Sequence, residues 1–523
     1  AGRLFRVDKI GAYRTTCGSG LDSAAAGLHI TLTMTAHADL LKHLRESDHL
    51  LSAARLLQWD QETYMPSGGE AARAEVLSTL AKFAHERATS KELADLAAAA
   101  KAAASMPDEI RQSELVDREL ERARKIPSRL VEETTRATSL AQQTWARAKK
   151  ERDFKTFQPH LEEVVKLKRE EGALLAPAGG TAYDGLLSDY ERGMDTADWT
   201  RLFDELEAEL PAMVSEIVER QKSTNARLDT VAGLKGPFPK DAQMNVCKKL
   251  AAALGYDFER GRLDLSAHPF SETVHAGDSR ITTRIDESEL TGSVYSTLHE
   301  TGHALYEQGL PEELSGTPLG MYCSMSVHES QSRLWENLVG RSDAFWQEQW
   351  PGVREALPAF SKMALEDWLA HSRRVARTFV RTESDEATYN LHVLVRFRLE
   401  KALILGDLQV ADLPGAWNEA YNKMLGITPP HVALGCMQDV HWSAGLFGYF
   451  PTYTLGNLLS AQLYQAAGKA DATADRKTLL AWLRQNIHAK ARRFETPDLI
   501  EQATGEKPTA KYFLAHLRGR YLG

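Results

Sequence analysis

Two histidines and a glutamate near the middle of the chain have the spacing of a metal-dependent hydrolytic site. Residues 293–309 read SVYSTLHETGHALYEQG, which places His299 and His303 four positions apart and Glu300 beside the first. On a helix such positions project from one face, so both imidazoles can bind one metal ion. Glu300 can then take a proton from the water that attacks a carbonyl carbon. HExxH also arises by chance, and the alternative is a surface helix with two unrelated histidines.

A catalytic zinc site needs a third protein ligand, and Glu329 is the best candidate. It lies in SVHESQSRLWENLVG, residues 326–340, which we predict as a second helix that ends at Gly340. A His–His–Glu set leaves one coordination position open. Two alternatives stay open: Glu329 can belong to a capping box that begins at Ser326, or His328 can be the third ligand.

Helices must position these residues, because apolar side chains recur at helical spacing over most of the chain. Residues 69–105 and 108–151 are Ala-rich with interspersed charges and predict long antiparallel helices. The stretch WDQETYMP, residues 59–66, predicts a loop between helices. Gly and Pro at 175–195 and 229–240 indicate connections. We therefore expect a mostly α fold, one large helical domain with a cleft.

One segment departs from the helical pattern. Residues 278–286, DSRITTRID, alternate Ile281, Thr283 and Ile285 with polar side chains, which predicts a strand just before the HExxH helix. We expect a small β-sheet beside that helix, with this strand at its edge. Asp278 and Arg280 share one face of the strand, and such an edge can hold an extended peptide through its backbone. A solvent-facing polar surface is the alternative.

The composition excludes several classes of protein. The 523 residues are 43% hydrophobic and 26% charged with a net charge of -9, which is typical of a globular protein and unlike a general nucleic-acid binder. No run of 18 apolar residues occurs, so we expect no membrane span. The four cysteines are scattered, without a CxxC pair, which favours a reducing, cytoplasmic location over a cysteine cluster or disulfide framework.

The first 33 residues differ from the rest. They begin with Ala1 rather than Met and are rich in Ser, Thr, Gly and basic residues, so they form either a targeting segment or a non-native extension. We expect residues 1–33 to lie outside the fold. No linker divides residues 34–523, which predicts a single catalytic domain.

Six short blocks occur in order along the chain. They are His268-Pro269-Phe270, Asp278-x-Arg280-x-Thr282, His299-Glu300-x-x-His303, His328-Glu329-Ser330-Gln331, Val380-Arg381-x-x-Ser384-Asp385 and Gly435-x-x-Gln438-Asp439-x-His441-Trp442. Together they resemble the thermostable carboxypeptidase (carboxypeptidase Taq) family of zinc metallocarboxypeptidases over about residues 35–523. Val380 and Ser384 stand where that family usually has Ile and Ala.

The resemblance implies an enzyme that releases single amino acids from the free C-terminus of peptide substrates, binds Zn²⁺ or in some members Co²⁺, and forms a homodimer. It also implies a large helical metallopeptidase fold with a deep cleft, which the N-terminal helices, about residues 34–175, cover. The nearest rival is a helical HExxH oligopeptidase or dipeptidyl carboxypeptidase. A helical interaction protein with a fortuitous HExxH and a zinc-stabilised non-enzyme are more distant alternatives.

Further site residues come from the resembling blocks. Arg381 is expected to bind the substrate carboxylate, unless it only pairs with Asp385 on a solvated helix. His441 or Tyr453 is expected to donate to the oxyanion, unless His441 and Asp439 merely satisfy each other. Asp385 is one candidate partner for a metal-bound histidine. The remaining expected groove residues are His268, Asp278, Arg280, Gln438 and Asp439.

Overall fold

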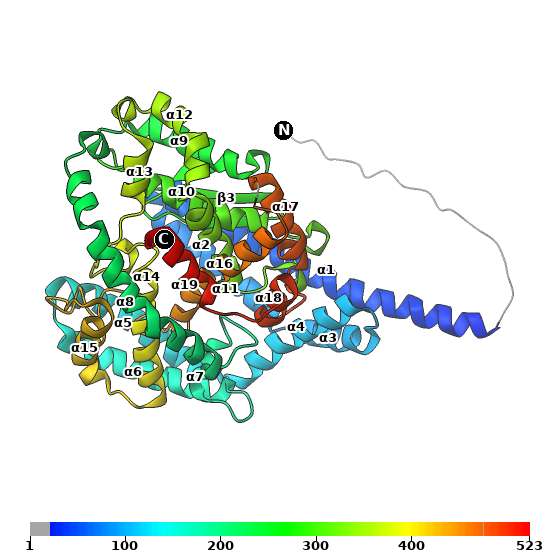
Figure 1. Cartoon of the computed structure of the whole chain (residues 1–523). Helices are drawn as coiled ribbons and strands as arrows, with labels where there is room; N and C mark the ends of the chain where they lie inside the picture. The colour runs from blue at the N-terminus through cyan, green and yellow to red at the C-terminus, as the bar shows by residue number, and fades with distance from the viewer. Residues whose placement is uncertain (1–20, 474) are drawn as a thin grey trace.

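The computed structural model describes residues 21–473 and 475–523, with the side chains of the first helix described from residue 35 onward (Figure 1). Residues 1–20 of the expected extension lie outside the described residues. The first helix nevertheless begins at Leu21, upstream of the boundary expected at residue 34. The described chain is predominantly helical, as predicted.

Six helices form the N-terminal part, and they correct two sequence predictions. Trp59 is buried and Thr63 donates to its carbonyl oxygen, so most of the expected loop is the last turn of the first helix. The two long helices expected after it are each divided in two, at Ser90, which caps the next helix, and at Pro127. The helices are α1 (Leu21–Thr63), α2 (Glu70–Ala88), α3 (Lys91–Ala103), α4 (Pro107–Lys125), α5 (Ser128–Glu151) and α6 (Phe154–Leu175).

The connection expected at 175–195 contains a short helix, α7 (Ala182–Leu187). Thr181 caps it by accepting from the backbone N–H of Asp184, while the Asp184 carboxylate accepts from the Thr181 N–H in return. Such reciprocal capping stabilises a helix too short to be recognised by periodicity. The long α8 (Thr196–Leu228) and α9 (Lys240–Leu254) follow.

A three-stranded sheet lies beside the HExxH helix, in the order β1-β3-β2. The strands are β1 (Leu263–Leu265), β2 (Ser271–His275) and β3 (Asp278–Thr283), with β1 parallel and β2 antiparallel to β3. The predicted strand is therefore central, and its prediction as an edge was wrong. Its neighbours already use its backbone hydrogen bonds, so the described edges of the sheet are β1 and β2.

Close backbone contacts bring three helices together around the site. They are α10 (Thr291–Glu307), α11 (Met325–Arg333) and α16 (Phe450–Lys469). A Cβ at Gly302 would fall 2.5 Å from Cα of Ser332, and one at Gly456 would fall 2.5 Å from Cγ of Glu329. Only glycine permits these approaches, so both glycines set how closely the helices pack.

The start of α11 excludes one alternative for Glu329. Ser324, and not Ser326, caps the helix by accepting from the N–H of Val327, so the capping box considered as an alternative is absent. A π-helical turn, Leu334–Val339, continues α11 to Gly340, close to the predicted helix end. Such turns are frequent at functional sites, and this one carries Glu336 beside the centre described below.

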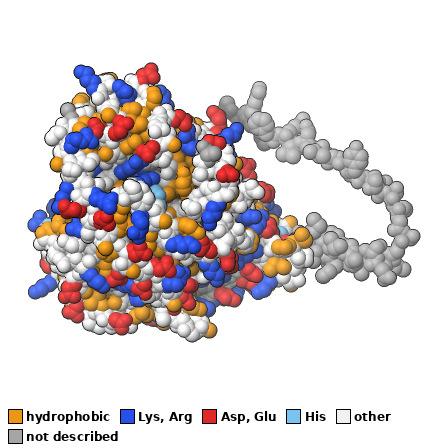
Figure 2. Space-filling view, viewed as in Figure 1, with side chains coloured by type: hydrophobic (Ala, Val, Ile, Leu, Met, Phe, Trp, Pro, Cys, Tyr) orange, Lys and Arg blue, Asp and Glu red, His pale blue; other side chains and the backbone are white. Residues whose placement is uncertain are grey.

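The remaining helices enclose one large apolar core that extends from Ala141 to Leu517. A smaller cluster around Leu40 and Leu93 joins α1, α3 and α4. No helix of the described chain is long and apolar enough to cross a membrane. On the face in Figure 2, acidic and basic side chains are interspersed. The helices are α12 (Asp343–Ala356), α13 (Leu365–Ser372), α14 (Tyr389–Leu405), α15 (Leu413–Leu425), α17 (Arg476–Asn486), α18 (Thr496–Thr504) and α19 (Lys511–Tyr521).

Candidate metal centre

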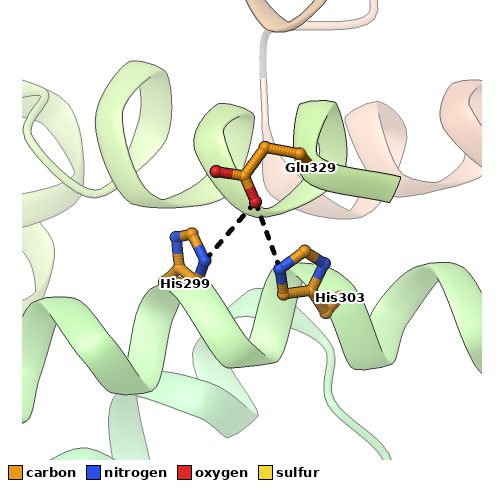
Figure 3. A group of neighbouring side chains, drawn as sticks. All are labelled: His299, His303 and Glu329. Carbon is orange, nitrogen blue, oxygen red and sulfur yellow. Dashed lines mark ion pairs between the residues drawn. The ribbon is translucent and has the colours of Figure 1, made fainter. Parts of the chain in front are cut away.

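His299 and His303 on α10 face Glu329 on α11 (Figure 3). Oε2 of Glu329 lies 3.4 Å from Nε2 of His303 and 3.7 Å from Nε2 of His299. One ligand atom of each residue lies within 4.8 Å of the others, and no other His, Cys, Asp or Glu group among the described residues converges in this way. Two imidazoles and one carboxylate fit a catalytic zinc ion.

The outer nitrogens of both histidines are held by different partners. Nδ1 of His299 donates to Oε2 of Glu336 at 2.9 Å, which leaves its Nε2 lone pair directed to the centre. Nδ1 of His303 lies 2.6 Å from Nδ1 of His328, whose Nε2 reaches Glu307 at 2.9 Å. His328 thus lies behind His303 and outside the converging group.

Asp385 does not take the partner role considered for it. Its carboxylate accepts from the backbone N–H groups of Ala376, Ala387 and Thr388. It therefore fixes the turn that precedes α14 and is occupied away from both histidines. The carboxylates that pair with histidines at the centre are instead Glu336 of the π-helical turn, beside His299, and Glu307 of α10, beside His328.

The environment of the centre favours the metal-binding protonation states of Glu329 and His303. Burial alone would raise the pKa of Glu329, but Arg333 and His299 outweigh it and hold that pKa well below its usual range. Burial and the neighbouring His328 lower the pKa of His303 to about 3. An ionised carboxylate and a neutral imidazole are the forms that ligate a metal ion, so Glu329 and His303 are already suited to bind one. Burial would lower the pKa of His299, but Glu329 and Glu336 outweigh it and raise that pKa, so metal binding competes with a proton at His299.

Glu300 and the three converging residues line a cavity of about 880 Å³. Glu300 is only 8% exposed, and burial raises its pKa to about 7, near the pH at which a general base works best. The cavity wall opposite α10 comes from distant parts of the chain. It includes Leu44, Asp48, Leu51 and Arg55 of α1, Glu272 and Thr273 of β2, and Tyr449 and Tyr453 at α16.

Arg381 is buried behind this wall. It lies in a short 3₁₀ turn at 6% exposure, so the alternative of a solvated helix paired with Asp385 is wrong. Its Nε and Nη2 donate to Asp439 and its Nη1 donates to Tyr389. The guanidinium is 5.0 Å from the ring centre of Tyr453, which does line the cavity.

Two expected groove residues hold Arg381 and do not line the cavity. Asp439 also accepts from Arg396, so it is neutralised by two guanidiniums and not by His441. Oε1 of Gln438 accepts the backbone N–H of Arg381 at 3.0 Å. Both residues fix the position of Arg381, a role that the sequence alone does not separate from contact with substrate.

Tyr453 is the expected oxyanion donor that reaches the cavity, and His441 lies behind it. The Tyr453 hydroxyl is 3.5 Å from Nε2 of His441. Burial lowers the pKa of His441 to about 4, so it is neutral at physiological pH. This geometry makes Tyr453 the residue in reach of a substrate and His441 its neighbour.

Three further expected groove residues do not line this cavity. His268 is exposed. Asp278 and Arg280 are engaged with each other in two hydrogen bonds, and Arg280 also packs over the ring of Trp59. The polar face of β3 thus fastens the end of α1 to the sheet.

The sequence interpretation missed three residues beside the centre. Arg333 and Tyr449 line the cavity, and Glu336 binds His299. Arg333 follows Glu329 by four residues and Glu336 follows it by seven, which is the spacing of one helical face. That spacing could have identified both once Glu329 was placed. No comparable local signal marks Tyr449.

Comparisons with known proteins agree with this architecture. A family model described as carboxypeptidase Taq (M32) metallopeptidase matches residues 39–521. Thermostable carboxypeptidase 1 of Thermus thermophilus is 41% identical over 505 residues, which covers 93% of this chain and 98% of the relative. The solved M32 carboxypeptidase of Deinococcus radiodurans R1 has a TM-score of 0.88 at 37% identity, with 93% of this chain and 99% of that chain covered. The solved structure of Trypanosoma cruzi metallocarboxypeptidase 1 has a TM-score of 0.89 at 32% identity, with 94% of this chain and 100% of that chain covered.

Proposed function

Because the chain belongs to the carboxypeptidase Taq (M32) family of metallopeptidases and is a metallocarboxypeptidase, we propose that it releases single C-terminal amino acids from peptides at a zinc centre held by His299, His303 and Glu329. The observation that carries this proposal is the convergence of two Nε2 atoms and one carboxylate oxygen on the cavity wall. Zinc suits this donor set best, and cobalt can replace it.

When bound, zinc supplies a Lewis acid that polarises the scissile carbonyl and lowers the pKa of water. Glu300 lies beside His299 and faces the same cavity, so its carboxylate takes the proton of the attacking water. It then carries that proton to the leaving amine. Burial keeps the Glu300 carboxyl poised for both directions of transfer, since its pKa is about 7.

The remaining expected residues receive roles that follow from their positions. Tyr453 donates its hydroxyl to the developing oxyanion, and His441 orients that hydroxyl from behind. Arg381 supplies the positive charge that attracts the substrate carboxylate, while Asp439 and Gln438 hold it. A direct contact with Arg381 requires Tyr389 or Tyr453 to move, because both now pack against it.

Product analysis tests this function. The protein is incubated with an N-blocked tetrapeptide, with and without a chelator, beside Glu300→Gln and the control Glu313→Gln, which makes the same charge change at an exposed site. Stepwise loss of single residues, abolished by the chelator and by Glu300→Gln but not by Glu313→Gln, is the expected result. Release of dipeptides or internal fragments would instead indicate a dipeptidyl carboxypeptidase or an oligopeptidase.

We also propose a homodimer in the cytoplasm. Large apolar side chains stay exposed on α1 and α2, among them Leu56, Val76 and Phe83, as expected of a surface that a second copy covers. Cys247, Cys323 and Cys436 are buried free thiols, which is consistent with a reducing compartment. Light scattering across a concentration series tests the dimer, and a single monomer mass throughout would refute it.

A further inference from the structure

Arg333 is a second guanidinium near the centre, and unlike Arg381 it lines the cavity directly. Its Nε donates to Oε1 of Glu329 at 2.7 Å, and its Nη1 donates to Oε2 of Glu336 at 3.1 Å. The side chain is 15% exposed and stacks over the ring of Tyr389, with 4.6 Å from Cζ to the ring centre. The guanidinium is therefore held by hydrogen bonds at its edge and by an aromatic ring against its planar face.

These contacts treat the two oxygens of Glu329 differently. Oε1 receives the Arg333 N–H, whereas Oε2 faces the two histidine nitrogens at 3.4 and 3.7 Å and lies 3.1 Å from the Ser332 hydroxyl. A carboxylate can bind a metal ion through one oxygen or through both, and a second bound oxygen would occupy the position that a catalytic site leaves open. A charge-assisted hydrogen bond on Oε1 opposes that second contact.

We propose that Arg333 is a positioning residue that keeps Glu329 bound to the metal through Oε2 alone and thereby preserves the open coordination position. The inference rests on the proposed metal site and deepens it. Arg333 acts through Glu329 and Glu336 and would itself touch neither the metal nor the reacting atoms.

The same guanidinium couples two of the three ligands. Glu336 accepts from Arg333 and from Nδ1 of His299 through one oxygen, Oε2. The contacts therefore form a closed ring, from Glu329 through Arg333 and Glu336 to His299 and back to Glu329 across the centre. Gly456 packs against Cβ and Cγ of Glu329, so the carboxylate has little room to turn away from this arrangement.

Arg341 provides a matched control. It also binds Glu336, through Nη2 and Oε1 at 3.4 Å, but its other contacts are with Asn337, the carbonyl of Ser372 and the ring of Tyr295. Arg341 therefore shares the acidic partner of Arg333 and contacts no metal ligand. A lysine at either position keeps the charge and loses the planar fork, since an ammonium cannot bridge two carboxylates in the same way.

Cobalt(II) substitution reads the coordination number directly, because four-coordinate cobalt absorbs visible light more strongly than five- or six-coordinate cobalt. We expect wild type and Arg341→Lys to share one spectrum, and Arg333→Lys to give a weaker, shifted band with one cobalt still bound. We further expect kcat to fall about 10- to 100-fold in Arg333→Lys, with a smaller change in KM. An unchanged spectrum in Arg333→Lys overturns the proposal.

Two further measurements keep the proposal testable if Arg333→Lys fails to fold or to hold cobalt. Glu336→Gln removes the charge that anchors Arg333 but leaves His299 an acceptor, and it should shift the cobalt band in the same direction. A crystal structure of the zinc-loaded wild type should show one Glu329 oxygen on the metal, and two bound oxygens would overturn the proposal. Failure of the proposed function would appear separately, as wild type that releases no amino acid in a metal-dependent way.

Discussion

His303 and His328 face each other through their Nδ1 atoms, 2.6 Å apart, on the side of His303 that points away from Glu329. Since Nε2 of His303 faces the centre, its Nδ1 carries the proton and donates it to His328. His328 in turn donates from Nε2 to Glu307. The pair thus fixes the tautomer and the ring orientation of His303.

Replacement of His328 by Phe should therefore weaken metal binding by about 10- to 100-fold, because His303 loses the acceptor that orients it. His328→Gln, which keeps an acceptor, should weaken it less. Competition with a chelator measures both affinities. If the Phe variant binds metal as tightly as wild type, His328 does not orient the ligand.

Gly456→Ala should displace the metal ligand Glu329, against which Gly456 packs. Its Cβ would lie 2.5 Å from Cγ of Glu329, so the carboxylate or α16 must shift. We expect a lower melting temperature together with loss of bound metal on dialysis, measured by elemental analysis. The control is Gly468→Ala on the same helix, where the nearest atom is 3.7 Å away and the change should be neutral or stabilise by about 0.5–1 kcal/mol. Equal metal content in the two variants would contradict the prediction.

Arg381→Lys should impair recognition of the substrate carboxylate. Lysine keeps the positive charge but cannot donate to Asp439 and Tyr389 while also binding a carboxylate. We expect KM for peptides with a free C-terminus to rise about 10- to 100-fold, as for the loss of a charge-assisted hydrogen bond. Peptides with an amidated C-terminus serve as the control and should be cleaved slowly by both proteins. The same proportional loss on both substrates would assign Arg381 a structural role.

Glu191 should make folding stability depend on pH. Its carboxyl is fully buried near the start of α11, where Oε1 accepts from the Thr496 hydroxyl, and the same hydroxyl oxygen lies 2.8 Å from Oγ of Ser324. Burial raises its pKa from 4.5 to about 7, so the folded chain holds a proton that the unfolded chain releases between those values. The contribution of Glu191 to stability therefore falls as pH rises through this window, by up to about 3 kcal/mol.

Glu191→Gln removes this titration, so its melting temperature relative to wild type should rise between pH 5 and pH 8. The exposed Glu313→Gln should show no such trend. Thermal unfolding of the three proteins at both pH values is the measurement. A constant difference between Glu191→Gln and wild type would mean that Glu191 is ionised throughout.

The features predicted correctly from the sequence are those that depend on neighbours along the chain. The HExxH helix and the helix that carries Glu329 follow from periodicity, and their packing then brings His299, His303 and Glu329 together. The strand at β3 was recognised from its alternation, but its central place was not, because strand order depends on pairing with β1 and β2. Trp59 lies in α1 with Arg280 of β3 packed on its ring, a contact that local sequence does not reveal.

The groove residues show the same limit. Arg381 was recognised as a site residue through a resemblance, yet its burial follows from Asp439, Tyr389 and Tyr453, which lie elsewhere in the chain. Conversely, Arg333 and Glu336 were not predicted, although they lie four and seven residues after Glu329 and therefore on the same helical face. Local sequence can place these partners of a ligand because they share its helix.

Because α1 forms part of the cavity wall, the cavity is complete only after α1 has docked during folding. All three converging side chains come from residues 299–329, whereas Arg55 of α1 reaches the carbonyl of Val274 across a far longer stretch of chain. Closing a longer loop costs more entropy and is slower, so α10 and α11 are expected to pair before α1 docks on β2. During folding the chain would then pass through a species that has already gathered its ligands while the cavity is still open on one side.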